Sequence, residues 1–107
     1  MQTKMISIAK DFSTTPAGRH AKFHPASGEA FRDSILLPAL RQGVVTVDLD
    51  GTAGYGSSFL EEAFGGLIRN GLAAETVRQR LKLKSSMTVY SDRIWRYIED
   101  EAERVAA

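Results

Sequence analysis

Residues 44–60 read Val-Val-Thr-Val-Asp-Leu-Asp-Gly-Thr-Ala-Gly-Tyr-Gly-Ser-Ser-Phe-Leu. The β-branched run at 44–49 is typical of a central strand covered on both faces, which indicates a parallel or mixed sheet. The glycines that follow predict a loop, and the apolar spacing from Ser58 onward predicts an amphipathic helix. Two adjacent hydroxyls, Ser57 and Ser58, therefore stand at a helix start, where unpaired backbone N–H groups favour polar or anionic groups. This junction is the strongest functional candidate in the sequence.

The sequence before this stretch predicts a strand, a loop and a helix. Residues 5–9 are apolar and partly alternating, as in a short strand. Residues 11–25 are rich in Thr, Pro, Gly, His and Lys and predict a loop, in which 20–23 could add a short hairpin strand. Residues 28–42 space their apolar side chains as a helix does, and Pro38 should kink or split that helix because it removes a backbone N–H.

The sequence after the junction predicts further helices and one more strand. Residues 58–69 carry two adjoining rows of apolar side chains, so one face of this helix belongs to the core. Its Gly65-Gly66 pair costs helix stability and predicts the close approach of another backbone. Residues 74–80 are expected to form a brief helix, the alternating residues 81–84 an edge strand, and residues 89–105 a closing amphipathic helix.

Length and composition restrict the class of protein. The chain of 107 residues has the size of one small domain, and we expect a single domain over residues 1–107. The net charge of +1 disfavours nucleic acid as a partner, and the lack of cysteine excludes disulfides and thiolate metal sites. No apolar run is long enough to span a bilayer, and the N-terminus lacks the apolar core of a signal peptide. We therefore expect a cytoplasmic protein that does not bind membranes.

The loop matches two catalytic motifs only in part. Gly51 and Gly56 have the glycine spacing of a phosphate-binding P-loop, but Ser57 stands where that motif needs a lysine. Hydrolysis of nucleoside triphosphates is therefore disfavoured. The nucleophile elbow of serine hydrolases needs a glycine where Leu60 stands, and both histidines lie upstream of the serines.

The polar residues of the junction allow more than one interpretation. Either Ser57 or Ser58 caps the helix by accepting a hydrogen bond from a backbone N–H of its first turn. Alternatively, a kinase phosphorylates one of them, which would change the surface charge without unfolding the domain. Both interpretations can hold together. Asp48 and Asp50 are interpreted as residues that end the strand and shape the turn rather than as a catalytic acid pair.

A modestly basic loop is the second candidate site. Arg19, His20 and Lys22, with His24 nearby, could bind an anion, although a solvated loop is the more ordinary interpretation. The two histidines have no carboxylates or thiols beside them in the sequence, so we expect no metal site.

Several of these segments together resemble a STAS-like domain, of the small bacterial group related to anti-sigma factor antagonists. They are the strand at 44–49, the Asp48-Leu49-Asp50-Gly51 turn, the Gly56-Ser57-Ser58-Phe59-Leu60-Glu61-Glu62 helix start, the Gly18-Arg19-His20 loop and the Ser27-Gly28-Glu29-Ala30-Phe31-Arg32 helix start. The resemblance implies an α/β fold, with a small mixed β-sheet of about four strands flanked by helices. It also implies binding rather than catalysis.

In the antagonist relatives, an Asp-Ser-Ser-Gly or Asp-Ser-Thr-Gly motif holds the serine that an anti-sigma kinase phosphorylates. Ser57 and Ser58 match the two hydroxyl positions, so the resemblance implies that they are the phosphorylation candidates. Gly56 replaces the aspartate of the motif, and Phe59 replaces its glycine.

The residues and the resemblance together predict a non-enzymatic regulatory domain of bacterial signalling or defence, without a cofactor. The resemblance implies a GHKL-type ATPase or kinase, or another signalling protein, as its partner, and a homodimer is left open. The alternative is a domain that senses a small ligand or nucleotide through the same glycine-rich loop. The partner-binding residues are expected at the loop and helix start: Asp50, Gly54, Tyr55, Gly56, Ser57, Ser58, Glu61 and Glu62.

Overall fold

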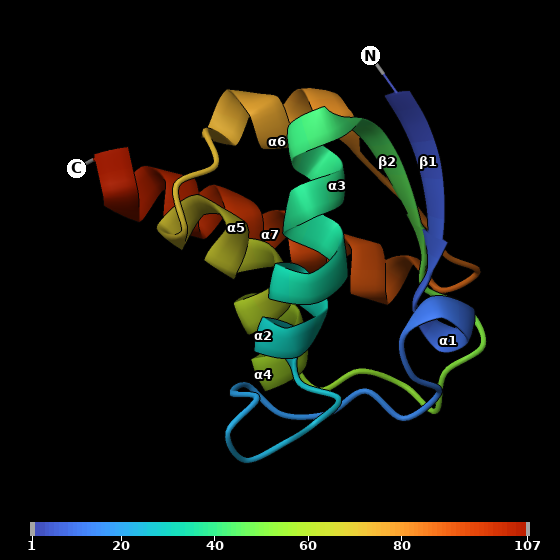
Figure 1. Cartoon of the computed structure of the whole chain (residues 1–107). Coiled ribbons are helices and arrows are strands. Elements are labelled where there is room, and N and C mark those ends of the chain that lie inside the picture. The colour runs from blue at the N-terminus through green and yellow to red at the C-terminus, as the bar shows by residue number, and fades with distance from the viewer. Residues whose placement is uncertain (1, 107) are drawn as a thin grey trace.

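A parallel sheet of three strands forms one layer of the structure, a computed structural model that describes residues 2–106. The strands are β1 (Gln2–Ser7), β2 (Gly43–Asp48) and β3 (Leu81–Lys84), and β2 lies between the other two. The expectation of an α/β fold is confirmed, but the sheet has three strands where about four were predicted, and all are parallel (Figure 1). Each crossover between strands passes through helices, as parallel pairing requires.

The sheet buries one face only, which corrects the expectation that β2 is covered on both. Val45 and Val47 are fully buried, whereas Val44 and Thr46 on the opposite face are half-buried. Met5 of β1 pairs with Thr46 and is 57% exposed. The helical layer lies on the side of Val45 and Val47, so the alternation along β2 separates a buried face from a partly open one.

The first strand ends earlier than the sequence predicted. Ser7 caps the short helix α1 (Ile8–Asp11), because its hydroxyl accepts a hydrogen bond from the Lys10 N–H at 3.1 Å. The chain therefore leaves the sheet at Ser7 rather than at Ala9. Residues 20–23 form turns instead of a hairpin strand, with the Phe23 and His24 N–H groups both donating to the His20 carbonyl.

Residues 28–42 form one helical column made of α2 (Gly28–Phe31), the π-helical turn η1 (Arg32–Leu36) and α3 (Leu37–Gln42) (Figure 1). Ser27 caps it by accepting a hydrogen bond from the Ala30 N–H at 3.1 Å. Pro38 was expected to kink or split this helix. Instead the turn before it is widened, with the Leu37 N–H donating to the carbonyl of Arg32 five residues back, and the column continues past Pro38.

Residues 57–69 form the second column, from α4 (Ser57–Leu60) through η2 (Glu61–Gly65) to α5 (Gly66–Arg69). After it come α6 (Ala74–Arg80), strand β3 and the long helix α7 (Thr88–Ala106), which packs along η2 and α5. Helices α3 and α6 pack against β2.

The core lies where the two helical columns meet over the sheet. The rings of Phe31 and Phe59 are 6.1 Å apart between centroids, and those of Phe31 and Phe64 are 6.3 Å apart. Gly28 permits this contact, because a Cβ atom there would lie 2.5 Å from the Phe59 carbonyl oxygen. The backbones of the two columns therefore come close at Gly28, and not at Gly65-Gly66, where the sequence predicted a close approach.

Candidate functional site

The loop from Leu49 to Gly56 leaves the carboxyl end of β2 and leads into α4. Gly51 has a φ of 94° and Gly54 a φ of 126°, a region of backbone conformation that side chains disfavour. These two glycines allow the chain to turn sharply at the edge of the sheet. In α/β folds this edge, beyond the carboxyl ends of the strands, is where ligands and partners commonly bind.

Ser57 and Ser58 lie exposed in the first turn of α4. The cap position is occupied by Gly56, with φ of −80° and ψ of 159°, and no side chain makes a capping hydrogen bond there. The prediction that one of the serines caps this helix is therefore wrong, because both come after the cap residue. The first N–H groups of the column are left without a side-chain acceptor beside two exposed hydroxyls.

Tyr55 supports the loop from beneath. Its side chain is 7% exposed, and its hydroxyl donates a hydrogen bond of 2.6 Å to the Leu49 carbonyl. The ring stacks on Phe59 with centroids 5.8 Å apart and meets the Tyr90 ring edge-on at 5.0 Å. Burial raises the pKa of the Tyr55 hydroxyl above its ordinary value. Tyr55 was expected among the partner-binding residues, but its side chain faces the core and holds the loop.

The two aspartates shape the turn, as the sequence indicated. Asp48 accepts a hydrogen bond from the Asp50 N–H at 3.0 Å. Asp50 joins the loop to the start of the last helix, because its carboxylate accepts hydrogen bonds from both the backbone N–H and the hydroxyl of Ser86 at 3.0 Å. These hydrogen bonds lower the pKa of Asp50, whose side chain stays exposed to solvent.

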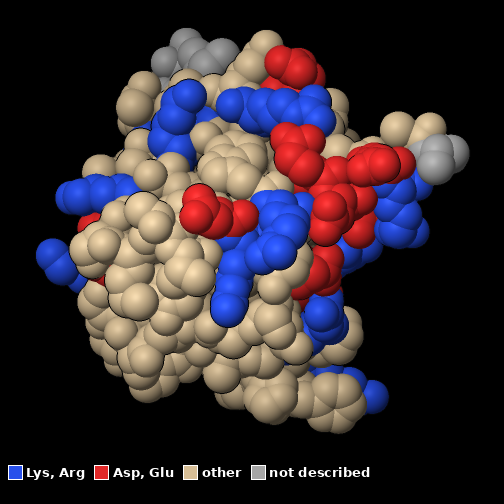
Figure 2. Space-filling model, turned by 180° about the vertical axis from the view of Figure 1, so that it is seen from behind, with Lys and Arg blue, Asp and Glu red and all other residues tan. Residues whose placement is uncertain are grey.

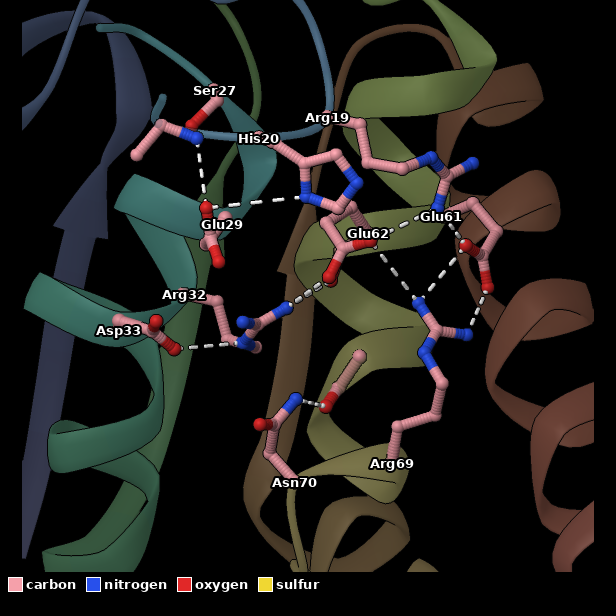
Figure 3. A network of polar contacts seen from close by, with 12 residues as sticks. Arg19, His20, Ser27, Glu29, Arg32, Asp33, Glu61, Glu62, Arg69 and Asn70 are labelled. Atoms are coloured by element: carbon pink, nitrogen blue, oxygen red, sulfur yellow. Dashed lines mark hydrogen bonds and ion pairs between the residues drawn. The ribbon is translucent and has the colours of Figure 1, made fainter. Parts of the chain in front are cut away.

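A network of arginines and glutamates lies between the two columns (Figure 3). Arg32 is 3% exposed, and its Nη1 atom donates to the Glu62 carboxylate at 2.6 Å and to the Glu62 carbonyl at 2.9 Å. Arg19 reaches from the basic loop to Glu61 at 2.5 Å and to Glu62 at 3.0 Å. Arg69 binds Glu61 from the other side at 2.6 Å. The network thus fastens the basic loop and both columns together.

Two predicted site residues belong to this network instead of a partner-binding surface. Glu62 is 8% exposed, and Glu61 is held between two arginines. Burial alone would raise the pKa of Glu62, but the hydrogen bonds from Arg32 and Arg19 outweigh it, so the pKa lies below its ordinary value. Both residues were expected to bind a partner, because the sequence does not show which arginines would cover them.

Gly65 and Gly66 make room for side chains of the network. A Cβ atom on Gly66 would collide with the Arg32 guanidinium, and one on Gly65 would lie 2.6 Å from a Glu61 carboxylate oxygen. The expectation that another backbone comes close at this pair is therefore wrong. The glycines instead allow an arginine to lie directly against the helix backbone.

The basic loop is less available to an anion than the sequence indicated. The Arg19 guanidinium is held by two glutamates, and His20 Nδ1 lies 4.0 Å from a Glu29 carboxylate oxygen. Lys22 lies over the ring of Phe23, which is 69% exposed. Of the three residues proposed for anion binding, Arg19 therefore has a structural role. Within residues 2–106, no group of three or more His, Cys, Asp or Glu side chains is arranged to hold a metal ion.

A hollow of about 230 Å³ lies at the carboxyl ends of β2 and β3, between the glycine-rich loop and the start of α7. Close by, Met87 and Val89 are apolar and exposed at 53% and 42%. Figure 2 shows charged side chains gathered over α6 and α7, and few of them at the lower left of that view, over this edge of the sheet. The hollow is lined by Leu49, Asp50, Gly51, Thr52, Ala53, Gly54, Ser86, Met87 and Tyr90.

The comparisons with known proteins identify the family. The model of the STAS-like domain of unknown function (DUF4325) matches residues 27–88. The chain belongs to this family. The match runs from the cap of α2 to the start of α7, so it includes the whole loop, the exposed serines and the Arg32–Glu62 pair.

The matched residues include every element from α2 to β3, while β1, α1 and most of α7 lie outside the match. Neither curated proteins nor solved structures gave a match. Between residues 2 and 106, no helix of the STAS-like domain combines the length and the apolar character that crossing a membrane requires.

Proposed function

We propose that this STAS-like domain is a regulatory protein-interaction module that binds rather than catalyses, and that a partner binds at the loop and helix start around Ser57. The observation that carries the proposal is the exposure of Ser57 and Ser58 at the first turn of a helical column that is fastened below the surface. A binding surface on a rigid support loses little conformational entropy when the partner binds.

The support and the surface are made by different residues. Tyr55 anchors the loop to Leu49, and Glu62 anchors the column to Arg32. The exposed residues of the loop and helix start are uncharged apart from Asp50, and the exposed Met87 lies beside the loop across the hollow. A surface with few charges and some apolar area suits a protein partner, since the buried centres of protein interfaces are depleted of charged residues.

Phosphorylation is proposed as the control of this surface. A phosphate on Ser57 or Ser58 would lie over the unpaired N–H groups of the first turn, where a negative charge is stabilised. It would also stand one helical turn before Glu61 and Glu62, which are already neutralised by arginines. The domain would therefore stay folded while its surface becomes strongly negative.

The family resemblance suggests the partner and the setting. We propose a GHKL-type ATPase or kinase, or another signalling or defence protein, in the cytoplasm of a bacterium. A homodimer that uses the same surface would be a competing state.

A second candidate function is the sensing of a small ligand or nucleotide in the hollow beside the loop. The hollow itself favours this alternative, because it lies where α/β folds bind ligands. Its only residue charged at neutral pH is Asp50, which repels phosphate, and its volume is below the 300–1,000 Å³ usual for ligand pockets. We therefore place it second.

Affinity capture with a matched pair of variants tests the proposal. Ser57→Arg adds bulk and charge at the exposed helix start, and Gln79→Arg adds the same charge to a long exposed side chain of α6. We expect cells of the source organism to yield a partner captured by wild type and by Gln79→Arg but lost with Ser57→Arg. Equal capture by all three proteins would overturn the proposed surface.

Two further measurements separate the alternatives. A clear rise in melting temperature with nucleotide would favour the ligand sensor over the interaction module. The intact mass of the protein purified from its own cells tests the phosphorylation. An unmodified chain under all growth conditions would remove that part of the proposal.

A further inference from the structure

The hollow at the carboxyl ends of β2 and β3 combines a single carboxylate with hydroxyl groups, loop backbone and a smaller apolar area. Asp50 is the only lining residue that is charged at neutral pH. Leu49 forms a buried floor, and Met87 and the Tyr90 ring stand at the start of α7. The hollow therefore offers one negative group among uncharged polar groups, with Met87 and the Tyr90 ring as apolar contacts.

The Asp50 carboxylate is oriented but not neutralised. Its Oδ1 atom accepts two hydrogen bonds from Ser86 at 3.0 Å, and its Oδ2 atom accepts one longer hydrogen bond at 3.2 Å. A carboxylate has about four acceptor positions, so Oδ2 keeps capacity for a further donor. Within residues 2–106 Asp50 forms no ion pair: Lys84 lies 4.0 Å from Asp48, and, after the hydrogen bonds from Ser86, it helps to lower the pKa of Asp50 only as a more distant positive charge.

The walls of the hollow are held in place. The Tyr90 ring meets the anchored Tyr55 ring edge-on, which fixes the side of the hollow formed by α7. Gly54 faces the Tyr90 hydroxyl, and a Cβ atom there would lie 3.3 Å from it. A side chain at that position would therefore narrow the space. The hollow of about 230 Å³ is too small for a typical nucleotide-sized ligand but large enough for one long side chain.

We propose that this hollow binds the cationic side chain of an arginine or lysine presented by a polypeptide partner. The aliphatic stem of such a side chain would lie against Met87 and the Tyr90 ring, and its charged end would donate to Asp50. This inference rests on the proposed function, because the loop that lines the hollow is the loop proposed to bind the protein partner, and that partner would supply the cationic side chain. The chemistry of the hollow is testable without that partner.

The test is a titration of the ¹⁵N-labelled full chain with blocked peptides, followed by amide chemical shifts. The probes are acetyl-Gly-Arg-Gly-amide and, as the uncharged control, acetyl-Gly-norleucine-Gly-amide. We expect saturable shifts of Gly51, Gly54, Ser86 and Tyr90 with the arginine peptide, with a Kd of about 1–10 mM, and far smaller shifts with the control. Higher salt should weaken the binding.

Two variants locate the binding. Asp50→Asn keeps an acceptor for Ser86 and removes the charge. We expect this variant to bind the arginine peptide about tenfold more weakly or worse. Asp100→Asn makes the same change on exposed α7 and should bind as wild type does.

The inference is overturned if the arginine peptide does not shift the amide signals of Gly51, Gly54, Ser86 and Tyr90. It is also overturned if Asp50→Asn lowers the affinity for the arginine peptide by less than about fivefold. It is also overturned if free arginine binds and the blocked peptide does not, because the hollow would then hold a free amino acid. Its failure is distinguishable from failure of the proposed function, which is decided by capture with Ser57→Arg.

Discussion

The two helical columns meet in a region of charged residues, and the edge of the sheet next to them presents almost uncharged ones. Between the columns, Arg32 and Glu62 are nearly fully buried and hydrogen-bonded to each other. At the edge, Ser57 and Ser58 are exposed and have no capping role. The comparison teaches that the charged residues between the columns hold the fold, while uncharged polar residues form the surface that we propose for binding.

Removing one partner of the buried pair should give the largest effect. Arg32→Ala removes the buried cation that donates to both the carboxylate and the carbonyl of Glu62, and leaves only the more exposed Arg19 and Arg69 beside that carboxylate. We expect the free energy of unfolding to fall by about 2–3 kcal/mol. Urea denaturation followed by circular dichroism measures this loss. The exposed pair of Arg78 and Glu99 is the control, and Arg78→Ala should change stability little because water screens the pair.

The double variant Arg32→Met with Glu62→Leu sharpens this prediction. It removes both charges and keeps the volume, so most of the stability lost in Arg32→Ala should return. If the double variant were as unstable as Arg32→Ala, packing rather than an unpaired charge would explain the loss.

Acidification should act on the same region with a smaller effect. Burial alone raises the pKa of Glu62, but hydrogen bonds from Arg32 and Arg19 hold it below the ordinary value of 4.5. The unfolded chain therefore binds protons first as the pH falls. The stability that Glu62 contributes is present above about pH 4.5 and is lost as the pH falls through the folded-state pKa.

We expect the free energy of unfolding to decrease below about pH 4.5, and Glu62→Gln to show a shallower decrease. The loss should be smaller than in Arg32→Ala, because a protonated Glu62 still accepts a hydrogen bond from Arg32. Urea midpoints measured across the pH range check this, and equally steep curves for wild type and Glu62→Gln would contradict it.

The support beneath the loop should show an intermediate effect. Tyr55→Phe removes the donor to the Leu49 carbonyl, and we expect a loss of about 1–2 kcal/mol together with faster hydrogen exchange at Ala53. Tyr97→Phe is the control, since among the described residues the Tyr97 hydroxyl makes no hydrogen bond. Unchanged exchange in Tyr55→Phe would mean that the loop does not depend on this anchor.

The smallest changes in the free energy of unfolding are expected for serine-to-alanine variants, which compare a serine that caps a helix with two exposed ones. Ser27→Ala removes the cap of α2 and should cost about 1 kcal/mol. Ser57→Ala and Ser58→Ala should change the free energy of unfolding by less than about 0.5 kcal/mol, because neither serine caps α4. Thermal unfolding of the three variants compares them directly. A loss at Ser57 as large as at Ser27 would break the division between support and surface.

The sequence predicted those parts of the fold that depend on local patterns. The β-branched run marked β2, the apolar spacing over residues 28–42 marked the column that begins with α2, and alternation marked β3. The count of strands was wrong, because residues 20–23 had weak turn and strand signals of similar strength. The open face of the sheet was also missed, since a β-branched run fits both a half-covered and a fully covered strand.

The candidate site could be predicted only in part. The glycine-rich loop and the exposed hydroxyls follow from local spacing, and the structure places them where the sequence indicated. The network could not be predicted, because Arg32 and Glu62 are 30 residues apart and no periodic pattern pairs them. The Glu61-Glu62 pair beside two glycines was the one available signal, since small residues leave room for a large side chain against the helix.

Binding of the captured partner to three proteins is the measurement that tests the account most directly. Titration calorimetry would compare wild type, Ser57→Arg and the double variant Arg32→Met with Glu62→Leu. The account predicts that Ser57→Arg binds at least about tenfold more weakly, while the double variant binds as wild type does. Binding that survives Ser57→Arg but is lost in the folded double variant would contradict it, because the charged region would then be the binding surface.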